Sequence, residues 1–191
     1  MALELLNEVG EEGLTTRRLA ERLGVQQPAL YWHFKNKRVL LDALAETILA
    51  EHHDHALPRA GENWRDFLVE NARSFRRALL TYRDGARIHA GTRPNNNQMG
   101  QVEAQIEFLV HAGFTPADAA RALITISHYV VGLALEQQAD FPETTPSDEA
   151  NIATTSTIAE AIATLDAEGP ESLFDFGLML LIDGLERHQR S

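Results

Sequence analysis

Polar side chains of the types that hold small molecules interrupt the apolar faces of several predicted helices. Asn71 lies four residues before Phe75 in an apolar stripe. Gln105 flanks a second stripe, and His128 lies on the apolar face of a third helix. A buried polar group is costly without a partner, so each residue alone is best explained by an internal hydrogen bond. Together with His53, which ends a fourth helix, they predict a mostly apolar pocket with a few fixed polar contacts.

Three neighbouring histidines, His52, His53 and His55, pose the alternative of a zinc site. Adjacent side chains on a helix diverge, and the chain offers no cysteine and no clear fourth ligand, so this pattern does not favour zinc. No segment matches a nucleophile elbow, a phosphate loop or a paired-carboxylate site. The sequence therefore does not predict an enzyme.

A second set of functional residues lies in the segment TTRRLAERLGVQQPALYWHF, from Thr15 to Phe34. Small Ala20 allows two helices to cross closely, and Gly24 takes the turn conformation that a side chain would resist. This pattern predicts a helix-turn-helix, with a small core made by Leu19, Leu23, Val25 and Leu30. The second helix then has the size of a major-groove reader and exposes Gln26, Gln27, Ala29, Tyr31, Trp32 and His33. Two aromatic residues and a histidine on a solvent-facing helix argue against an ordinary helical hairpin inside a bundle.

The distribution of charge supports a DNA-binding tip. The chain has a formal net charge of −11, which by itself argues against nucleic acid as a partner. Between Thr15 and Leu40, however, six basic residues accompany a single acid, so this segment carries +5 and the rest of the chain −16. A basic tip on an acidic body confines DNA contact to one end of the molecule.

The elements that must position these residues are all predicted to be helices, since no run of alternating β-branched residues occurs. Residues 1–36 are expected to form a three-helix DNA-binding domain whose first helix, about Ala2 to Glu8, is short and truncated at its start. Residues 37–191 are expected to form a larger ligand-binding and dimerisation domain. Thr15 or Thr16 and Asn63 are the predicted N-caps of the helices that follow them, and a further helix is expected to start at Asn36.

The body is predicted to contain helices over 63–82, up to Gly91, over 97–111 and over 116–138, then a linker from Asp140 to Asn151 and two final helices, the last from Pro170 to His188. No apolar run is predicted to cross a bilayer, and no signal peptide is recognised. With the absence of cysteine, this favours the cytoplasm and no membrane partner.

The segment LTTRRLAERLGVQQPALYWHFKNKRVLLDAL resembles the DNA-binding head of the TetR family of transcriptional repressors. In the body, NARSFRRALLTYRDGARIHAGTRP, the neighbourhood of Gln105 and ISHYVVGLALEQQ are similar to the tetracycline-responsive members of that family, and the similarity fades after Gln138. The resemblance implies a homodimeric repressor that a tetracycline–Mg²⁺ complex releases from its double-stranded operator DNA.

The resemblance also implies roles for residues of the head. Groove and base contacts would come from Arg17, Gln27, Pro28, Ala29, Tyr31, Trp32 and His33, and phosphate contacts from Thr16 and Lys37. Ala29 stands where the tetracycline-responsive members carry threonine, and Gln26 replaces their usual acid. The operator is therefore expected to differ from theirs at one or two base pairs.

By the same resemblance, the polar edge of the drug would be held by His53, Asn71, Phe75 and Gln105, with His128 lining the pocket. The Mg²⁺ carried by the drug would bind His89 directly and Thr92 and Glu136 through water, with Glu136 from the other subunit. Arg93 and Pro94 would belong to a turn that moves on binding. Mg²⁺ prefers oxygen ligands and keeps its waters, so one imidazole is not expected to hold it in the apo protein.

Helices 116–138 and 170–188 are the apolar candidates for a four-helix dimer core, which would place two heads in successive major grooves. Ile158, Ile162 and Leu165 are expected to close the pocket from the partner subunit. Binding near His89 is expected to shift the short helix before Gly91 and to push the connector from Asn36 to His53. Two alternatives remain at this stage: a TetR-family regulator induced by another drug or polyketide, and a DNA-organising protein that needs no ligand.

Overall fold

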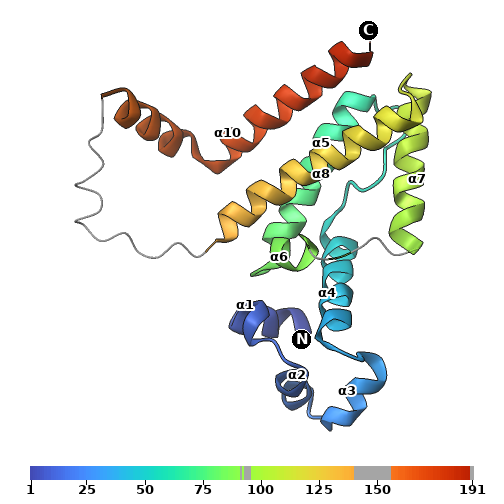
Figure 1. Ribbon diagram of the computed structural model, residues 1–191, viewed down its shortest axis with the longest axis vertical. Coiled ribbons are helices and arrows are strands. Elements are labelled where there is room, and N and C mark those ends of the chain that lie inside the picture. The colour runs from blue at the N-terminus through green and yellow to red at the C-terminus, as the bar shows by residue number, and fades with distance from the viewer. Residues whose placement is uncertain (91, 93–95, 140–155, 190–191) are drawn as a thin grey trace. The chain divides into compact units, whose positions relative to one another are not determined.

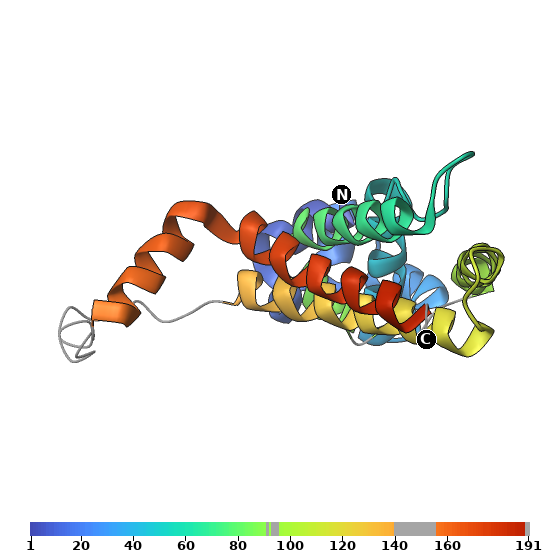
Figure 2. The same ribbon diagram turned by 90° about the horizontal axis from the view of Figure 1, so that it is seen from above.

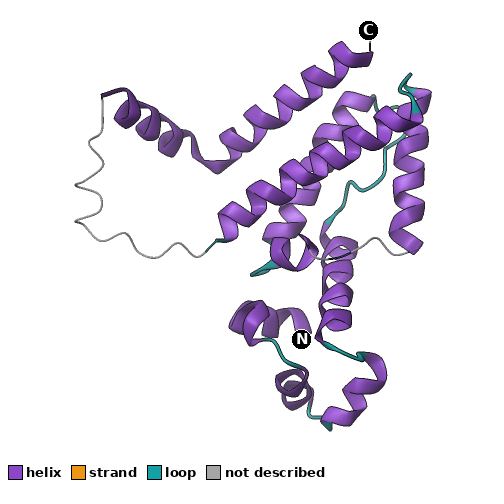
Figure 3. Cartoon of the chain, viewed as in Figure 1, coloured by secondary structure: helices purple, strands orange, loops and turns teal. Residues whose placement is uncertain are grey.

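The computed structural model describes residues 1–90, 92, 96–139 and 156–189. Within these ranges every regular element is a helix and no strand occurs, as the cartoon in Figure 3 shows. The chain divides into two compact units, residues 1–138 and 139–191, which are described separately. The predicted all-α fold is confirmed.

The head begins with α1 (Ala2–Gly13), α2 (Thr16–Leu23) and α3 (Gln27–His33). Thr15 caps α2, because its Oγ1 accepts the N–H of Arg18 at 3.2 Å. Gly24 ends α2 at φ 68°, a conformation that favours glycine, and Pro28 lies in the first turn of α3, where its missing N–H costs nothing. The helix-turn-helix therefore forms from local signals that the sequence carries.

Two expectations about the head are corrected by the structure. The first helix does not end at Glu8 but extends to Gly13, because a further helical turn follows the break at Gly10, where φ is 67°. Leu19 and Leu30 are buried as expected, but Leu23 is 40% exposed and Val25 44% exposed. The core beneath the motif is filled instead by the α1 residues Leu5 and Leu6, by Leu14 and by side chains of the next helix.

That next helix, α4 (Lys37–His52), runs from the head to the body (Figure 1). Asn36 caps it, since the side-chain oxygen of Asn36 accepts the N–H of Val39 at 2.9 Å. Its buried side chains Leu40, Leu44 and Ile48 belong to one hydrophobic core that also contains head residues and Ile88 of the body. Head, connector and body thus share packing rather than being joined by a free linker.

The body consists of α5 (Trp64–Leu80), α6 (Gly85–Ala90), α7 (Asn96–His111) and α8 (Pro116–Gln138). α5 packs against both α4 and α8, whereas α7 packs against α8 and is seen end-on in Figure 2. Two edge-to-face aromatic pairs stabilise the packing of α5 in the body. The ring centroids are 5.3 Å apart for Phe67 and Phe108 and 5.1 Å apart for Trp64 and Phe114.

By length and composition alone, α8 would be able to cross a membrane, contrary to the expectation from the sequence. This test is also passed by core helices of soluble proteins, and the apolar residues of α8 are used within the body. Ala119, Ala122, Ile126, Val130 and Ala134 are buried, and Leu123, Val131 and Leu135 line the cavity described below.

The second unit contains α10 (Ser156–Gln189), which is two helices joined at Gly169, where φ is 78°. The following Pro170 starts the second half, as predicted from the sequence. Phe174, Leu178 and Ile182 are buried at a spacing of four residues. Leu173, Phe176 and Leu180, on another side of the same helix, are 47%, 66% and 57% exposed. The predicted linker, residues 140–151, lies outside the described residues.

Candidate functional site

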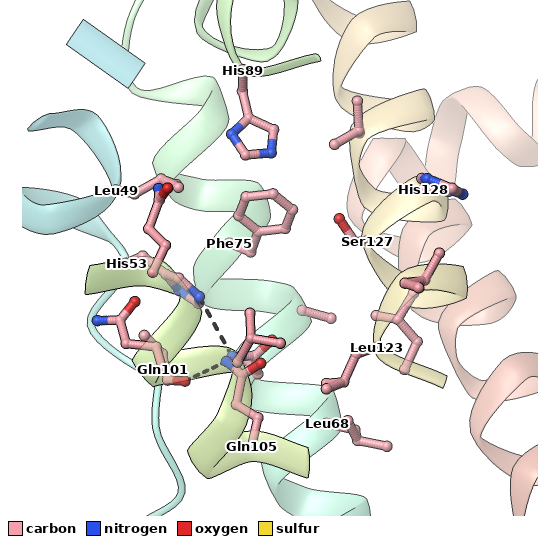
Figure 4. Close-up of a pocket in the computed structure, with 18 of the residues that line it drawn as sticks. Leu49, His53, Leu68, Phe75, His89, Gln101, Gln105, Leu123, Ser127 and His128 are labelled. Atoms are coloured by element: carbon pink, nitrogen blue, oxygen red, sulfur yellow. Dashed lines mark hydrogen bonds between the residues drawn. The ribbon is translucent and has the colours of Figure 1, made fainter. Parts of the chain in front are cut away.

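A cavity of about 720 Å³ lies in the body, with walls from the end of α4 and from α5, α6, α7 and α8. The structure brings most of the predicted ligand residues onto its wall, namely His53, Asn71, Phe75, His89, Thr92, Gln105 and His128. Apolar residues such as Leu49, Leu68 and Leu123 make up most of the surface between them (Figure 4). A large, mostly apolar cavity with a few polar groups is the usual form of a site for a drug-sized molecule.

Phe75 lies between the rings of His53 and His89, two of the three histidines that line the cavity (Figure 4). Its ring centroid is 5.6 Å from that of His53 and 5.0 Å from that of His89, the latter in an edge-to-face arrangement. Burial lowers the pKa of both imidazoles, that of His53 to about 4, because a charged ring is poorly solvated there. Both rings are therefore neutral near pH 7.

His53 is held by hydrogen bonds at both of its ring nitrogens. Nδ1 lies 2.9 Å from the hydroxyl of Ser74, and Nε2 lies 3.4 Å from the amide nitrogen of Asn71. The same Asn71 nitrogen donates to the carbonyl oxygen of His55 at 2.9 Å, which fixes the direction of the amide. Gln105, on α7, donates from Nε2 to the carbonyl oxygen of Ala56 at 2.6 Å. These bonds hold the polar groups in place before any ligand enters.

His89 is suited to hold a metal. Its Nδ1 is buried and has no hydrogen-bond partner among the described residues. Thr92 is tied to the same turn, because its N–H and its hydroxyl both donate to the carbonyl oxygen of His89 at 2.8 Å. The lowered pKa of His89 keeps the ring unprotonated, which is the form that binds a metal. One imidazole beside a threonine hydroxyl fits an ion that brings most of its other ligands with it.

Three of the predicted ligand residues are not placed on the cavity. Arg93 and Pro94 lie outside the described residues. Glu136 is exposed and is not among the residues that line the cavity of its own chain. His128, although it lines the cavity, is itself exposed.

The three neighbouring histidines have different partners. His52 stacks edge-to-face on Tyr82, with ring centroids 5.5 Å apart. His53 contacts Ser74, and Nε2 of His55 lies 2.8 Å from the carboxylate of Glu62. Within the described residues no group of three or more metal-ligating side chains is found. The three rings therefore have separate partners.

Several residues that line the cavity were not predicted from the sequence, among them Gln101, Ser127 and Leu49. Helical spacing was the signal that would have found them. Gln101 precedes Gln105 by one turn of α7, and Ser127 lies four residues after Leu123 and four before Val131 on α8. In Figure 4 Ser127 points toward the side of the cavity that Phe75 and His89 occupy.

The predicted DNA-contacting residues lie on α2, α3 and the start of α4. Arg17, Pro28, Ala29, Tyr31, Trp32 and His33 are exposed, and the side chain of Trp32 is 89% accessible. The amide nitrogen of Gln27 lies 3.5 Å from both the hydroxyl of Thr16 and that of Tyr31, which links the two helices. Lys37 donates to the carbonyl oxygen of Glu11 at 2.7 Å, and Arg17 pairs with Glu21 at 3.0 Å.

Comparison with known proteins gives consistent matches to both parts of the chain. The family model "Bacterial regulatory proteins, tetR family" matches residues 1–44, and the model "Tetracyclin repressor-like, C-terminal domain" matches residues 57–189. The tetracycline repressor protein class A from transposon 1721 of Escherichia coli is 57% identical over 191 residues, covering 98% of this chain and 88% of that protein.

Two solved structures are similar over nearly the whole chain. The crystal structure of TetR from Acinetobacter baumannii AYE is 56% identical with a TM-score of 0.83, and the match covers 100% of this chain and 95% of that one. The structure of class A TetR in complex with 5a,6-anhydrotetracycline and magnesium is 52% identical with a TM-score of 0.78, and the match covers 97% and 94% of the two chains.

Proposed function

This chain belongs to the TetR family of bacterial regulatory proteins, and from that premise we propose that it is a homodimeric repressor released from operator DNA by a tetracycline–Mg²⁺ complex. The observation that carries the proposal is the cavity itself, where the neutral ring of His89 lies beside a wall of fixed polar groups. Relatives at 57% identity that are tetracycline repressors, and a similar structure that holds anhydrotetracycline and magnesium, support the same ligand.

In this proposal the polar edge of the drug meets His53, Asn71 and Gln105, and its apolar body lies against Phe75 and the leucines of the wall. The rigid hydrogen bonds at these residues reduce the ordering cost of binding, since the groups already point into the cavity. His128 contributes from α8.

Magnesium, when bound with the drug, supplies a positive charge that joins the drug's oxygens to the protein. His89 would hold it directly, and the hydroxyl of Thr92 and the carboxylate of Glu136 would hold it through water, with Glu136 coming from the partner subunit. The exposed position of Glu136, away from the cavity of its own chain, agrees with that origin. Arg93 and Pro94 follow Thr92 directly and would move with it.

The head would bind operator DNA with α3 in the major groove. The proposed groove contacts are the half-buried Gln27 and the exposed Arg17, Pro28, Ala29, Tyr31, Trp32 and His33, and the proposed phosphate contacts are Thr16 and Lys37. Such a repressor acts by binding rather than by catalysis, and its place is the cytoplasm, where its DNA is. Ala29 offers only a methyl group, which suits contact with a thymine methyl at that position of the operator.

A titration of tetracycline into the protein, followed by drug fluorescence, tests this proposal. Saturable binding at micromolar drug in Mg²⁺, and its loss in EDTA, is the expected result, because His89 alone offers too little to the drug without the metal. Binding that ignores EDTA, or no binding, would favour the rival regulator with another inducer. If no small molecule changed operator affinity, the ligand-independent DNA-organising protein would be the better account.

A further inference from the structure

Ser74 stands at the centre of a small hydrogen-bond network beside the cavity, and its role is not one of direct ligand contact. Its side chain is fully buried, and it does not line the cavity. Three groups surround its hydroxyl oxygen: Nδ1 of His53 at 2.9 Å, the backbone N–H of His55 at 3.1 Å and Oδ1 of Asp54 at 2.7 Å. A serine hydroxyl has one proton to donate and two lone pairs to accept with.

The partners of Ser74 decide where that one proton goes. The N–H of His55 is a donor, so it takes one of the lone pairs. The carboxylate of Asp54 is only an acceptor, and its pKa is held below the ordinary value first by this hydrogen bond and then by Arg77. The hydroxyl proton therefore points to Asp54, and the remaining lone pair faces His53. Nδ1 of His53 must then carry a hydrogen in order to bond to Ser74 at all.

The other side of the ring gives an independent indication. The Asn71 amide turns its NH₂ group toward His53, because that group also donates to the carbonyl oxygen of His55. A donor 3.4 Å from Nε2 suits a nitrogen that bears a lone pair rather than a hydrogen (the dashed line at His53 in Figure 4). The imidazole is also neutral, since burial lowers its pKa to about 4, so only one ring nitrogen is protonated near pH 7.

We infer that Ser74 and Asp54 are positioning residues that fix His53 as the Nδ1–H tautomer, so that Nε2 is a hydrogen-bond acceptor. In the free protein its lone pair faces the long 3.4 Å contact from Asn71, and a ligand donor takes the place of that contact. The ligand group that meets Nε2 must then donate a hydrogen bond, as an enol or phenol hydroxyl does. A free imidazole prefers the opposite tautomer, so the protein has to impose this one. The first part stands on the free protein alone, and only the ligand part rests on the proposed function.

Long-range ¹H–¹⁵N NMR of the free protein at pH 7.5 tests the tautomer, with the His53 signals identified by their loss in His53→Gln. The wild-type ring is expected to be protonated at Nδ1. In Asp54→Ala the serine proton is free to turn to Nδ1, and in Ser74→Ala the ring loses its acceptor, so both variants are expected to move toward the Nε2–H form. A wild-type ring protonated at Nε2, or two variants that keep the wild-type tautomer, would overturn the inference.

Asp54→Asn is the matched control, because Ser74 and Arg77 both aim donors at Oδ1, so the asparagine presents its oxygen there and keeps the Nδ1–H tautomer. Asp54 is 69% exposed, so neither of its variants threatens the fold. We expect Asp54→Ala to weaken Mg²⁺–tetracycline binding about tenfold relative to Asp54→Asn, with operator affinity unchanged. A changed tautomer with equal affinities would refute the ligand part. Absence of tetracycline binding in the wild type would refute the proposed function and leave the tautomer result intact.

Discussion

At the scale of single residues, Phe75 separates two buried imidazoles that have different environments. His53 has hydrogen-bond partners at both ring nitrogens, whereas Nδ1 of His89 has none among the described residues. A buried polar atom without a partner is costly, and a bound ion or ligand is one way in which such an atom is satisfied. The contrast agrees with the proposal that His53 contacts the drug and that His89 binds the Mg²⁺ carried by the drug.

The lowered pKa of His53 predicts a specific dependence of stability on pH. Above pH 6.5 the ring is neutral in the folded and the unfolded chain, so it adds no pH dependence. Between pH 6.5 and about 4 the unfolded chain takes up a proton that the folded chain refuses, so stability falls as the pH falls. The loss is about 1.4 kcal/mol per pH unit and roughly 3 kcal/mol over the window.

Urea unfolding of wild type and His53→Gln between pH 4 and pH 8 measures the contribution of His53 to the free energy of unfolding, because other titrating groups affect both proteins alike. The free-energy difference between the two is expected to be constant above pH 6.5 and to shift in favour of the variant below it. Parallel curves across the whole range would show that His53 is not held neutral by burial.

The sequence predicted the residues that face the cavity better than those that support them. Asn71, Gln105 and His128 are conspicuous because each is a polar residue on an apolar helix face. Ser74 carries no such signal, since a serine within a helix is ordinary. Its role depends on the fold bringing it to His53 and Asp54, about twenty positions earlier in the chain, and that juxtaposition is visible only in three dimensions.

At the scale of elements, helix starts were predictable because capping is local. Thr15, Asn36 and Asn63 all cap the helices that were expected to start there. The end of α1 was not predictable in the same way. A glycine usually ends a helix, but Gly10 at φ 67° is followed by one more helical turn, which Glu11 secures by donating its N–H to Asp84 at 2.7 Å. A contact 73 residues away in sequence therefore decides the boundary.

The second half of α10 carries an exposed apolar stripe, Leu173, Phe176 and Leu180, that we propose as part of the dimer interface. Apolar side chains clustered on one face of a helix mark an interaction surface. On α8, His128, Gly132 and Glu136 also form an exposed row at helical spacing. The roles proposed for Glu136, and for Ile158, Ile162 and Leu165 of the first half of α10, require a second subunit.

Phe176→Asp is expected to weaken the dimer at least tenfold, because the substitution places a charge in an apolar interface. Sedimentation velocity over a range of protein concentrations measures the change. Leu57→Asp, which introduces the same charge at an apolar residue that is 45% exposed and lies outside α10, is the matched control and should leave the dimer intact. Equal dimerisation of the two variants would remove this stripe from the interface.

At the scale of the whole molecule, the charge is divided between one basic segment, residues 15–40, which carries +5, and the rest of the chain, which carries −16. The negative charge on the rest of the chain repels DNA, so DNA binding is restricted to the basic segment in the head. A protein with a net charge of −11 needs such a segment in order to bind DNA. The net charge alone would argue against DNA binding, and only the distribution of charge along the sequence supports it.

One packed core reaches from the head to the residue that precedes His89 of the cavity. Ile88 of α6 is buried with residues of α1, α2, α3 and α4, and the next residue, His89, lines the cavity. A close-packed core does not absorb a shift of one member without moving others. We therefore propose that movement of α6 on binding the drug displaces α4 and the head, so that drug and operator oppose each other reciprocally.

Release of bound operator DNA tests the central claim most directly. A fluorescent duplex carrying the operator, first selected from random DNA, is bound by the protein and titrated with tetracycline in Mg²⁺ or in EDTA while its anisotropy is followed. The account predicts release in Mg²⁺, none in EDTA, and no release from His89→Ala, although that variant binds the operator as tightly as wild type. Release of wild type and His89→Ala at the same drug concentration, or persistence of the complex in saturating drug and Mg²⁺, would contradict it.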